Sequence, residues 1–298
     1  MKYLVVCHGD GDGIIGAACI IKEYKLPMDK TKIVFTQPFL LDQVEVKDKV
    51  KAIFVVDLSV NNHNLSVTLN FADKYYHRIV TWVSHHYNTE EKLARILGPK
   101  LLCDKTAHSC PAIMVNSGYE EVSTTWVKAA NAINKPTEYP ETPLSKRFEQ
   151  AFKVSLIEAQ DGNNSMVEKI QRAFLSELLT GEEEGLLNIY GARYESVMRA
   201  TQKAAESFFE FRPGIGLVVL GDAQVDRAAV CSKGCENFLI TVVQFHSLEN
   251  GDPMTMIATN NKDLNLVTTF ELPSGNPSKV TLPGNLKKTR DMIIYKLS

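Results

Sequence analysis

The first hundred residues alternate between short apolar runs and segments with helical spacing. Several of the runs are apolar throughout, which is typical of strands buried on both faces of a parallel sheet. The predicted strands cover residues 3–6, 32–36, 52–57, 78–83 and 101–103, and the predicted helices cover residues 14–24 and 89–97, with another beginning near Ser109. Strands that alternate with helices build α/β folds. We therefore predict an N-terminal, mostly parallel sheet flanked by helices.

The pattern changes twice further along the chain. It becomes helical from residue 120 to about residue 207 and strand-like after Pro213. The predicted helices cover residues 144–159, 166–179 and 187–208, and the predicted strands cover residues 216–220, 238–245, 254–258 and 264–270. We expect a first domain over residues 1–185, a long linking helix over residues 186–212, and a smaller α/β domain over residues 213–298.

Polar side chains follow three of the N-terminal strands. The first strand runs into His8, Asp10 and Asp12, which alternate with glycines, the third ends on Asp57, and the fourth runs into His85. An extended tip would turn the first three of these side chains to the same side, because side-chain direction in extended backbone alternates. The carboxyl ends of parallel strands also meet at the sheet edge where ligands bind. The sequence therefore predicts that these five side chains converge.

Taken separately, each of these motifs has an ordinary structural explanation. A His-x-Asp-x-Asp-Gly stretch is usually a polar turn, and an adjacent pair such as His85 and His86 usually lies on a surface or in a core. Their joint placement at one edge favours a metal site. Oxygen ligands with one or two imidazoles suit Mn²⁺ or Mg²⁺ better than zinc, whose structural sites usually recruit thiolates.

Composition narrows the class of protein. The chain has 298 residues, 44% of them hydrophobic, so it can bury a substantial core without cross-links. Its 33 basic and 35 acidic residues give a net charge of -2, and no global basic field points to nucleic acid. No run has the character of a signal peptide or the length of a membrane span. We expect a cytoplasmic protein whose six cysteines are buried thiols, or include a disulfide if the source is an extreme thermophile.

Four blocks of the sequence resemble the DHH phosphoesterase family, which includes RecJ-type exonucleases, nanoRNases, cyclic-dinucleotide phosphodiesterases and family II pyrophosphatases. The blocks are Cys7-His-Gly-Asp-Gly-Asp-Gly13, Val55-Val-Asp57, Trp82-Val-Ser-His-His86 and, by analogy, Leu156-Ile-Glu-Ala-Gln-Asp161. Their order and approximate spacing agree with the family over residues 1–165. The resemblance implies that the first domain is a metal-binding catalytic domain and that the smaller domain binds substrate.

The resemblance also implies a dinuclear Mn²⁺ centre, with Mg²⁺ as the alternative ion. Its ligands would be His8, Asp10, Asp12, Asp57, His85 and Asp161. In that scheme Asp57 bridges the two ions and His86 faces the substrate phosphate. Two such ions can generate hydroxide from water near neutral pH and clamp the attacking and leaving oxygens. The expected reaction is hydrolysis of a phosphodiester.

The chain departs from the family at Ser84, where the namesake motif has an aspartate. In the family that carboxylate supports the adjacent ligand histidine, and losing such a partner typically costs about 10–100-fold in metal affinity or activity. Three explanations are open: a natural variant that stays active, a natural member drifting toward a non-catalytic role, or an engineered substitution that disables the enzyme. We count Ser84 with His86 as a catalytic candidate.

A second departure concerns the C-terminal domain. Many relatives carry there a glycine-rich block that ends in histidine and holds the substrate, and this sequence lacks it. Lys279, Lys287 and Arg290 lie at a comparable place, and His108 precedes a helix at the predicted metal edge. These four are candidates for substrate binding, with ordinary surface residues as the alternative explanation.

Together these features favour a metal-dependent phosphodiesterase or exonuclease that acts on nucleotides or on short or single-stranded nucleic acids. One alternative is a catalytically weak or inactive DHH-like binding or scaffold protein, motivated by Ser84 and the missing glycine-rich block. A second alternative is a pyrophosphate or polyphosphate hydrolase. No membrane partner is expected.

Overall fold

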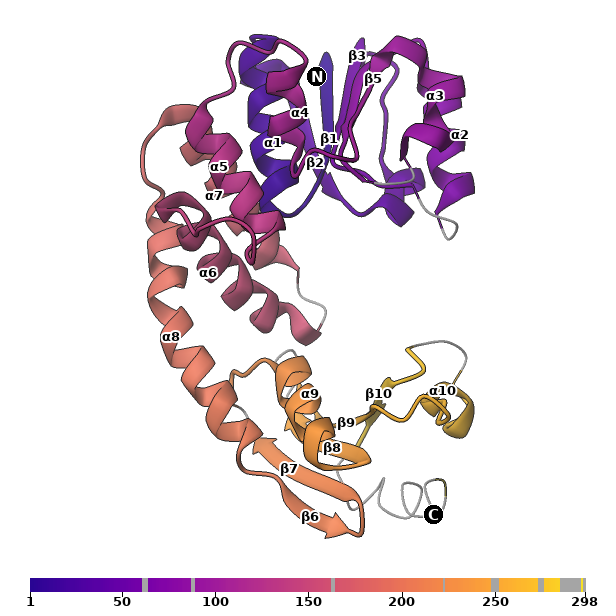
Figure 1. Cartoon of the computed structure of the whole chain (residues 1–298), viewed down its shortest axis with the longest axis vertical. Coiled ribbons are helices and arrows are strands. Elements are labelled where there is room, and N and C mark those ends of the chain that lie inside the picture. Colours follow the sequence, from indigo (N-terminus) through magenta and orange to yellow (C-terminus); the bar gives the residue numbers. More distant parts are fainter. Residues whose placement is uncertain are drawn as a thin grey trace. The chain divides into compact units, whose positions relative to one another are not determined.

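The chain folds into two compact units, each with its own sheet. The computed structural model describes residues 1–60, 64–86, 89–161, 164–221, 223–247, 252–272, 276–284 and 296. One unit comprises Met1–Phe152 with Glu168–Gly191, and the other comprises Lys153–Val167 with Ala192–Ser298. Helices α6 (Pro143–Glu158), α7 (Ser165–Thr180) and α8 (Gly185–Ala205) have residues in both units (Figure 1).

The N-terminal unit contains the predicted parallel sheet, with strand order β2-β1-β3-β4-β5. Every neighbouring pair in it is parallel. The strands are β1 (Tyr3–His8), β2 (Thr31–Thr36), β3 (Ala52–Val56), β4 (Ile79–Ser84) and β5 (Leu101–Cys103). Helices lie against both faces of the sheet, with α1 and α4 on one side and α2 and α3 on the other (Figure 1). The predicted α/β class is therefore confirmed.

Several helices of this unit begin at a polar residue that caps them. Besides α6 to α8, its helices are α1 (Gly11–Glu23), α2 (Leu65–Tyr75), α3 (Thr89–Leu97), α4 (Cys110–Asn116) and α5 (Thr124–Asn134), with short 3-10 turns at Met28–Lys30, Pro38–Gln43 and Gly98–Lys100. A further 3-10 turn, Ala159–Asp161, lies in the other unit. The Asp10 carboxylate caps α1 by accepting the N–H of Gly13 at 2.9 Å. The prediction of an extended tip from residue 8 to residue 12 is therefore wrong: α1 begins at Gly11, and Asp12 lies in its first turn.

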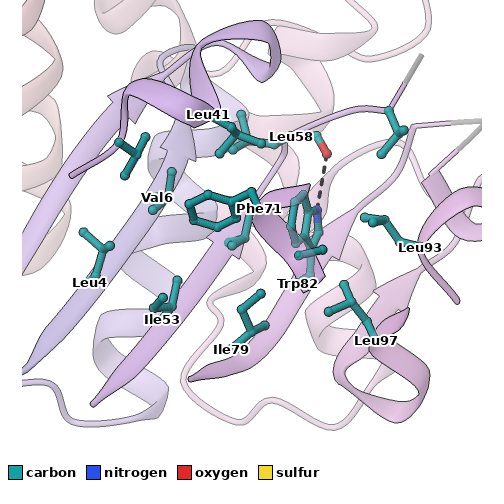
Figure 2. Packing of buried hydrophobic residues seen from close by; sticks show 14 of the residues in the cluster. Leu4, Val6, Leu41, Ile53, Leu58, Phe71, Ile79, Trp82, Leu93 and Leu97 are labelled. Carbon is teal, nitrogen blue, oxygen red and sulfur yellow. Dashed lines mark hydrogen bonds between the residues drawn. The ribbon is translucent and has the colours of Figure 1, made fainter. Parts of the chain in front are cut away.

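Trp82 anchors the core beneath the C-terminal end of β4. Its side chain is fully buried, and its indole Nε1 donates a hydrogen bond to the Leu58 carbonyl at 3.3 Å. Figure 2 shows it beside Phe71 of α2 and near Leu93 of α3. A buried aromatic side chain of this size dominates the packing energy of its neighbourhood. This packing fixes the strand end from which the His85 and His86 segment departs.

The second unit contains a mixed sheet with strand order β10-β9-β8-β7-β6. Strands β7 and β8 are parallel, and the other neighbouring pairs are antiparallel. Its strands are β6 (Phe209–Arg212), β7 (Ile215–Gly221), β8 (Ile240–His246), β9 (Pro253–Thr259) and β10 (Lys279–Pro283), and its shorter helices are α9 (Arg227–Asn237) and α10 (Leu266–Thr269). The expectation of a smaller C-terminal α/β part reached through a long helix is confirmed, with α8 as that helix.

One predicted strand is a helix. Residues 264–270 were expected to be extended, but α10 occupies Leu266–Thr269. The side chain of Asn265 accepts the N–H of Thr268 at 3.2 Å and so caps this turn. The apolar face of α10 packs Leu266 into the core of the second unit. Tertiary packing and a local cap thus override the strand preference of a run rich in β-branched residues.

Two further expectations concern the whole chain. All six cysteines are free thiols, and five of them are buried. Within the described part of the chain, no helix is both long enough and apolar enough to cross a membrane.

Candidate metal centre

The ends of three adjacent parallel strands carry the candidate ligands. β1 ends at His8, β3 is followed directly by Asp57, and β4 is followed by His85 and His86. Because β1, β3 and β4 are neighbours in the sheet, their carboxyl ends lie at one edge. The structure therefore brings these side chains together, as the sequence pattern predicts.

Asp57 lies at the centre of the cluster and is 2% exposed. Its Oδ1 is 3.0 Å from Nε2 of His86 and 3.4 Å from Nε2 of His85, while its Oδ2 is 3.6 Å from Nδ1 of His8. The backbone at Asp57 adopts a left-handed conformation with φ 59°. Aspartate tolerates this region better than most residues. The turn lets the chain leave the sheet directly after the strand while the carboxylate stays among the imidazoles.

His8 and Asp10 form a second part of the cluster. Nδ1 of His8 is 2.7 Å from Oδ2 of Asp10, and Nε2 of His8 donates to Oε1 of Gln37 at 3.0 Å. The other Asp10 oxygen caps α1 through Gly13. A side chain at Gly13 would collide with the carbonyl oxygen of His8, so this tight turn requires glycine. The turn thereby holds both ligand candidates against Asp57.

Asp12 approaches from the first turn of α1 and is fully buried. Its Oδ2 is 3.3 Å from Nε2 of His85. The backbone N–H of Cys110 donates to both Asp12 oxygens, at 3.0 and 3.2 Å, and Nδ2 of Asn134 donates to Oδ2 at 2.8 Å. These donors compensate the cost of burying the carboxylate.

Cys110 also touches the cluster with its thiol, which lies 3.6 Å from Oδ1 of Asp57. Burial, together with the nearby carboxylates of Asp12 and Asp57, raises the pKa of this thiol well above its usual range. The thiol therefore stays protonated and donates to Asp57. Sequence reasoning missed Cys110, Asn134 and Gln37, because each comes from a segment without a recognisable motif.

The imidazoles hold the carboxylates by carrying protons. Burial lowers the pKa of His8, but hydrogen bonds to Asp10 and Asp57 outweigh it and raise this pKa to about 11. Burial also lowers the pKa of His85, but hydrogen bonds to Asp12 and Asp57 outweigh it and raise this pKa to about 10. Burial, followed by the charge of Asp57, raises the pKa of Asp12 to about 7. Burial acts upward on the pKa of Asp57 too, yet the three histidines hold it well below its usual value.

The donor set fits a divalent cation. Among the described residues, candidate ligand atoms form three groups, and within each group the atoms lie within 4.8 Å of one another. The groups are Asp57 with His85 and His86, Asp57 with His8 and Asp10, and Asp57 with Asp12 and Cys110. Imidazole nitrogens and carboxylate oxygens in this mixture suit ions such as Mn²⁺. A bound cation would replace the protons that now balance the carboxylates. These residues would therefore hold such a cation.

Ser84 and His86 occupy different surroundings. Ser84 is fully buried, and its hydroxyl accepts the N–H of His86 at 3.3 Å and donates to Oγ1 of Thr89 at 3.2 Å. These contacts hold the loop after β4. His86 points its Nε2 at Asp57 while its side chain stays 38% exposed, so it borders both the cluster and solvent.

Of the four candidates for substrate binding, the structure describes His108 and Lys279, and these two lie in different units. His108 lies beside the cluster: its carbonyl accepts from Asn134 at 3.1 Å, and its ring nitrogen is 3.6 Å from Glu138. Lys279 is half-buried at the start of β10 in the other unit. Lys287 and Arg290 lie outside the described residues, as does the side chain of the proposed ligand Asp161.

Among known proteins, this chain is similar to solved structures at the level of the fold. The sequence matches no protein-family model and no curated protein. Among solved structures, the chain is similar to a pGpG-specific phosphodiesterase, PggH from Vibrio cholerae, with a TM-score of 0.56 and 12% identity over 100% of this chain and 97% of that one. The fold is that of the DHH phosphoesterases. The exonuclease RecJ bound to manganese shares this fold, with a TM-score of 0.53 and 12% identity over 99% of this chain and 88% of that one.

A third solved structure has a similar fold. CDC45 from Entamoeba histolytica aligns with a TM-score of 0.54 and 7% identity over 100% of this chain and 95% of that one. At such identities the likeness concerns the fold. The activity of a chain with this fold depends on the residues at its site.

Proposed function

We propose that the chain is a metal-dependent phosphodiesterase or exonuclease that hydrolyses nucleotides or short nucleic acids. The proposal rests on Asp57, which belongs to all three groups of candidate ligand atoms found among the described residues. A carboxylate surrounded in this way is suited to bridging two cations. We further propose His8, Asp10, Asp12, His85 and Asp161 as the remaining ligands of a centre with two Mn²⁺ ions, with Mg²⁺ as an alternative.

The protein residues around the proposed centre have separable tasks. Bound divalent ions would supply a hydroxide nucleophile from water and neutralise charge on the phosphate. His86 has an exposed face beside Asp57 and would donate an N–H to a phosphate oxygen. The hydroxyl of Ser84 accepts the backbone N–H of His86 and so helps to place this residue at the rim of the cluster.

The proposed substrate class draws on the activities of two structural neighbours. One acts on pGpG, and the other is an exonuclease with manganese bound. Both activities cleave phosphodiester bonds next to a nucleoside. The net charge of -2 on this chain gives no general field for long nucleic acids, which favours short substrates.

The test is hydrolysis by the purified full chain with and without Mn²⁺. The substrates are pGpG, a short RNA, a short single-stranded DNA, a cyclic dinucleotide and pyrophosphate. We expect Mn²⁺-dependent release of nucleotide from at least one of the first four and none from Asp57→Asn. Release of phosphate from pyrophosphate alone would replace the proposed substrate class by the pyrophosphatase alternative.

A second candidate is a binding protein with little or no catalysis, and Ser84 is the observation that favours it. The variant Ser84→Asp separates the two. Because an aspartate here can still accept the N–H of His86 and can accept the hydroxyl hydrogen of Thr89, we expect it to fold. Restored support for the adjacent histidine would raise metal affinity or activity by about 10–100-fold. If both proteins bind Mn²⁺ and neither hydrolyses any substrate, the binding function is favoured.

A further inference from the structure

The C-terminal end of α5 reaches the proposed metal centre through a carboxamide. α5 carries two asparagines one turn apart, and both contact the segment before α4. Oδ1 of Asn131 accepts the hydroxyl of Ser109 at 2.6 Å. Nδ2 of Asn134 donates to Oδ2 of Asp12 at 2.8 Å and to the carbonyl of His108 at 3.1 Å. Only the second asparagine therefore meets a proposed ligand among the described contacts.

The neighbours of Asn134 determine how its amide is oriented. The two short contacts are to a carboxylate oxygen and a carbonyl oxygen, which can only accept, so the nitrogen must face them. The opposite orientation would place an amide oxygen against two acceptors. An amide nitrogen has two hydrogens, and these contacts use both. Nε2 of His85 lies 3.4 Å from the same nitrogen, yet no hydrogen remains for it, so Asn134 would not compete for this ring nitrogen when a cation replaces its proton.

We propose that Asn134 is a positioning residue of the metal centre, which orients the Asp12 carboxylate and keeps it beside Nε2 of His85 for a shared divalent cation. The inference rests on the proposed function, because it takes Asp12 and His85 as metal ligands. Asp12 is fully buried, and its other described partners are the backbone N–H of Cys110 and the proposed ligand His85. Asn134 thus supplies a side-chain contact from outside the proposed ligands that helps to set the rotation of the carboxylate. As a neutral group, it does so without competing for the cation.

The experiment compares Mn²⁺ affinity, measured by isothermal titration calorimetry, in the full-length wild type, Asn134→Leu and Asn131→Leu. Leucine keeps the branched shape of asparagine and removes its hydrogen bonds. We expect Asn134→Leu to bind Mn²⁺ about 10–100-fold more weakly, as is typical when a partner of a metal ligand is lost. Asn131→Leu disturbs the same helix and loop but should bind with wild-type affinity. Urea unfolding in EDTA reports the folding of each variant separately.

The outcomes distinguish the inference from the proposed function. A wild type that binds no Mn²⁺ overturns the proposed function itself. If the wild type binds and Asn134→Leu binds equally well, or if both variants weaken binding equally, the positioning role is overturned and the function stands. Should Asn134→Leu not fold, Asn134→Ser keeps one donor and must still bind more weakly than wild type. In an Asp12→Asn background, Asn134→Leu should cause no further loss of affinity, because Asn134 acts through Asp12, and a further loss contradicts the proposal.

Discussion

The substitution Asp57→Asn tests the centre of the cluster with the least disturbance of its backbone. Asparagine has the shape of aspartate and, like it, tolerates the left-handed conformation found here at φ 59°. The substitution removes the one charge that His8, His85 and His86 all face, within 3.0 to 3.6 Å. If Asp57 bridges two ions, its loss weakens both at once.

The expected magnitude follows from linkage between binding and folding. A ligand at one hundred times its Kd stabilises the folded state by about 2.7 kcal/mol. Each kcal/mol raises the melting temperature of a unit of this size by roughly 2–4 °C, so wild type should gain about 5–10 °C in Mn²⁺. If Asp57→Asn weakens binding by about 100-fold, the same Mn²⁺ concentration adds only about 0.4 kcal/mol, or roughly 1 °C.

Differential scanning calorimetry in EDTA and in Mn²⁺ measures these shifts. Asp226→Asn is the matched control, because it makes the same chemical change at a buried carboxylate that caps α9 in the other unit. It should lower the melting temperature in EDTA and leave the Mn²⁺-dependent shift intact. A full shift in Asp57→Asn would refute the assignment of Asp57 as a metal ligand.

Three further predictions concern the stability of the fold. Trp82→Phe leaves the Leu58 carbonyl without its buried donor and should cost about 1–3 kcal/mol in urea unfolding, whereas an unchanged midpoint would show that this hydrogen bond contributes nothing. Gln171→Ala removes the buried donor to the Gly9 carbonyl at 2.8 Å and should cost a similar amount, about 1–3 kcal/mol, in the same assay, and equal unfolding curves would contradict it. Burial raises the pKa of Asp226, but Lys153 and the N–H groups of α9 outweigh it and lower this pKa. Its contribution is therefore complete above the usual aspartate pKa of about 3.9 and is lost as pH falls through the lower folded value. Lys153→Met should cost about 1 kcal/mol or less at pH 7, because the lysine is 43% exposed, and the difference from wild type should shrink below about pH 4; a pH-independent difference would exclude the ion pair as its cause.

The parallel sheet was predictable because several of its strands are apolar runs. Residues 101–103 match β5, and the other four strands agree to within two residues at each end. The mixed sheet was harder, since its edge strands lack such runs. β6 has four residues and is mostly exposed, and β10 has five residues and pairs only with β9, so neither forms an apolar run that stands out in the sequence. The hydrophobic pattern also failed to identify α10, because the cap at Asn265 decides between helix and strand there.

At the site, the sequence indicated which side chains converge but not how they are held. Convergence follows from topology, because Asp57 and His85 end neighbouring parallel strands. The supporting contacts come from tertiary packing. Asn134 and Asp12 are far apart in the sequence, and no spacing rule joins the end of a helix to the first turn of another. The helical position of Asp12 was missed because the cap at Asp10 starts α1 earlier than its apolar residues suggest.

The surroundings of Ser84 bear on whether the DHH fold serves catalysis in this chain. Its hydroxyl is engaged with His86 and Thr89, so the described hydrogen bonds that hold the buried carboxylates come from other segments. The N–H of Cys110 and the amide of Asn134 hold Asp12, and the thiol of Cys110 reaches Asp57. Buried carboxylates at one edge lower the stability of a fold unless something compensates them, and apolar residues would serve a purely structural interface at less cost. Two buried carboxylates among three imidazoles supply the oxygen and nitrogen ligands that a divalent cation takes, and the surrounding donors hold the carboxylates in place. We therefore expect metal binding to persist in this chain whatever Ser84 does to the rate of hydrolysis.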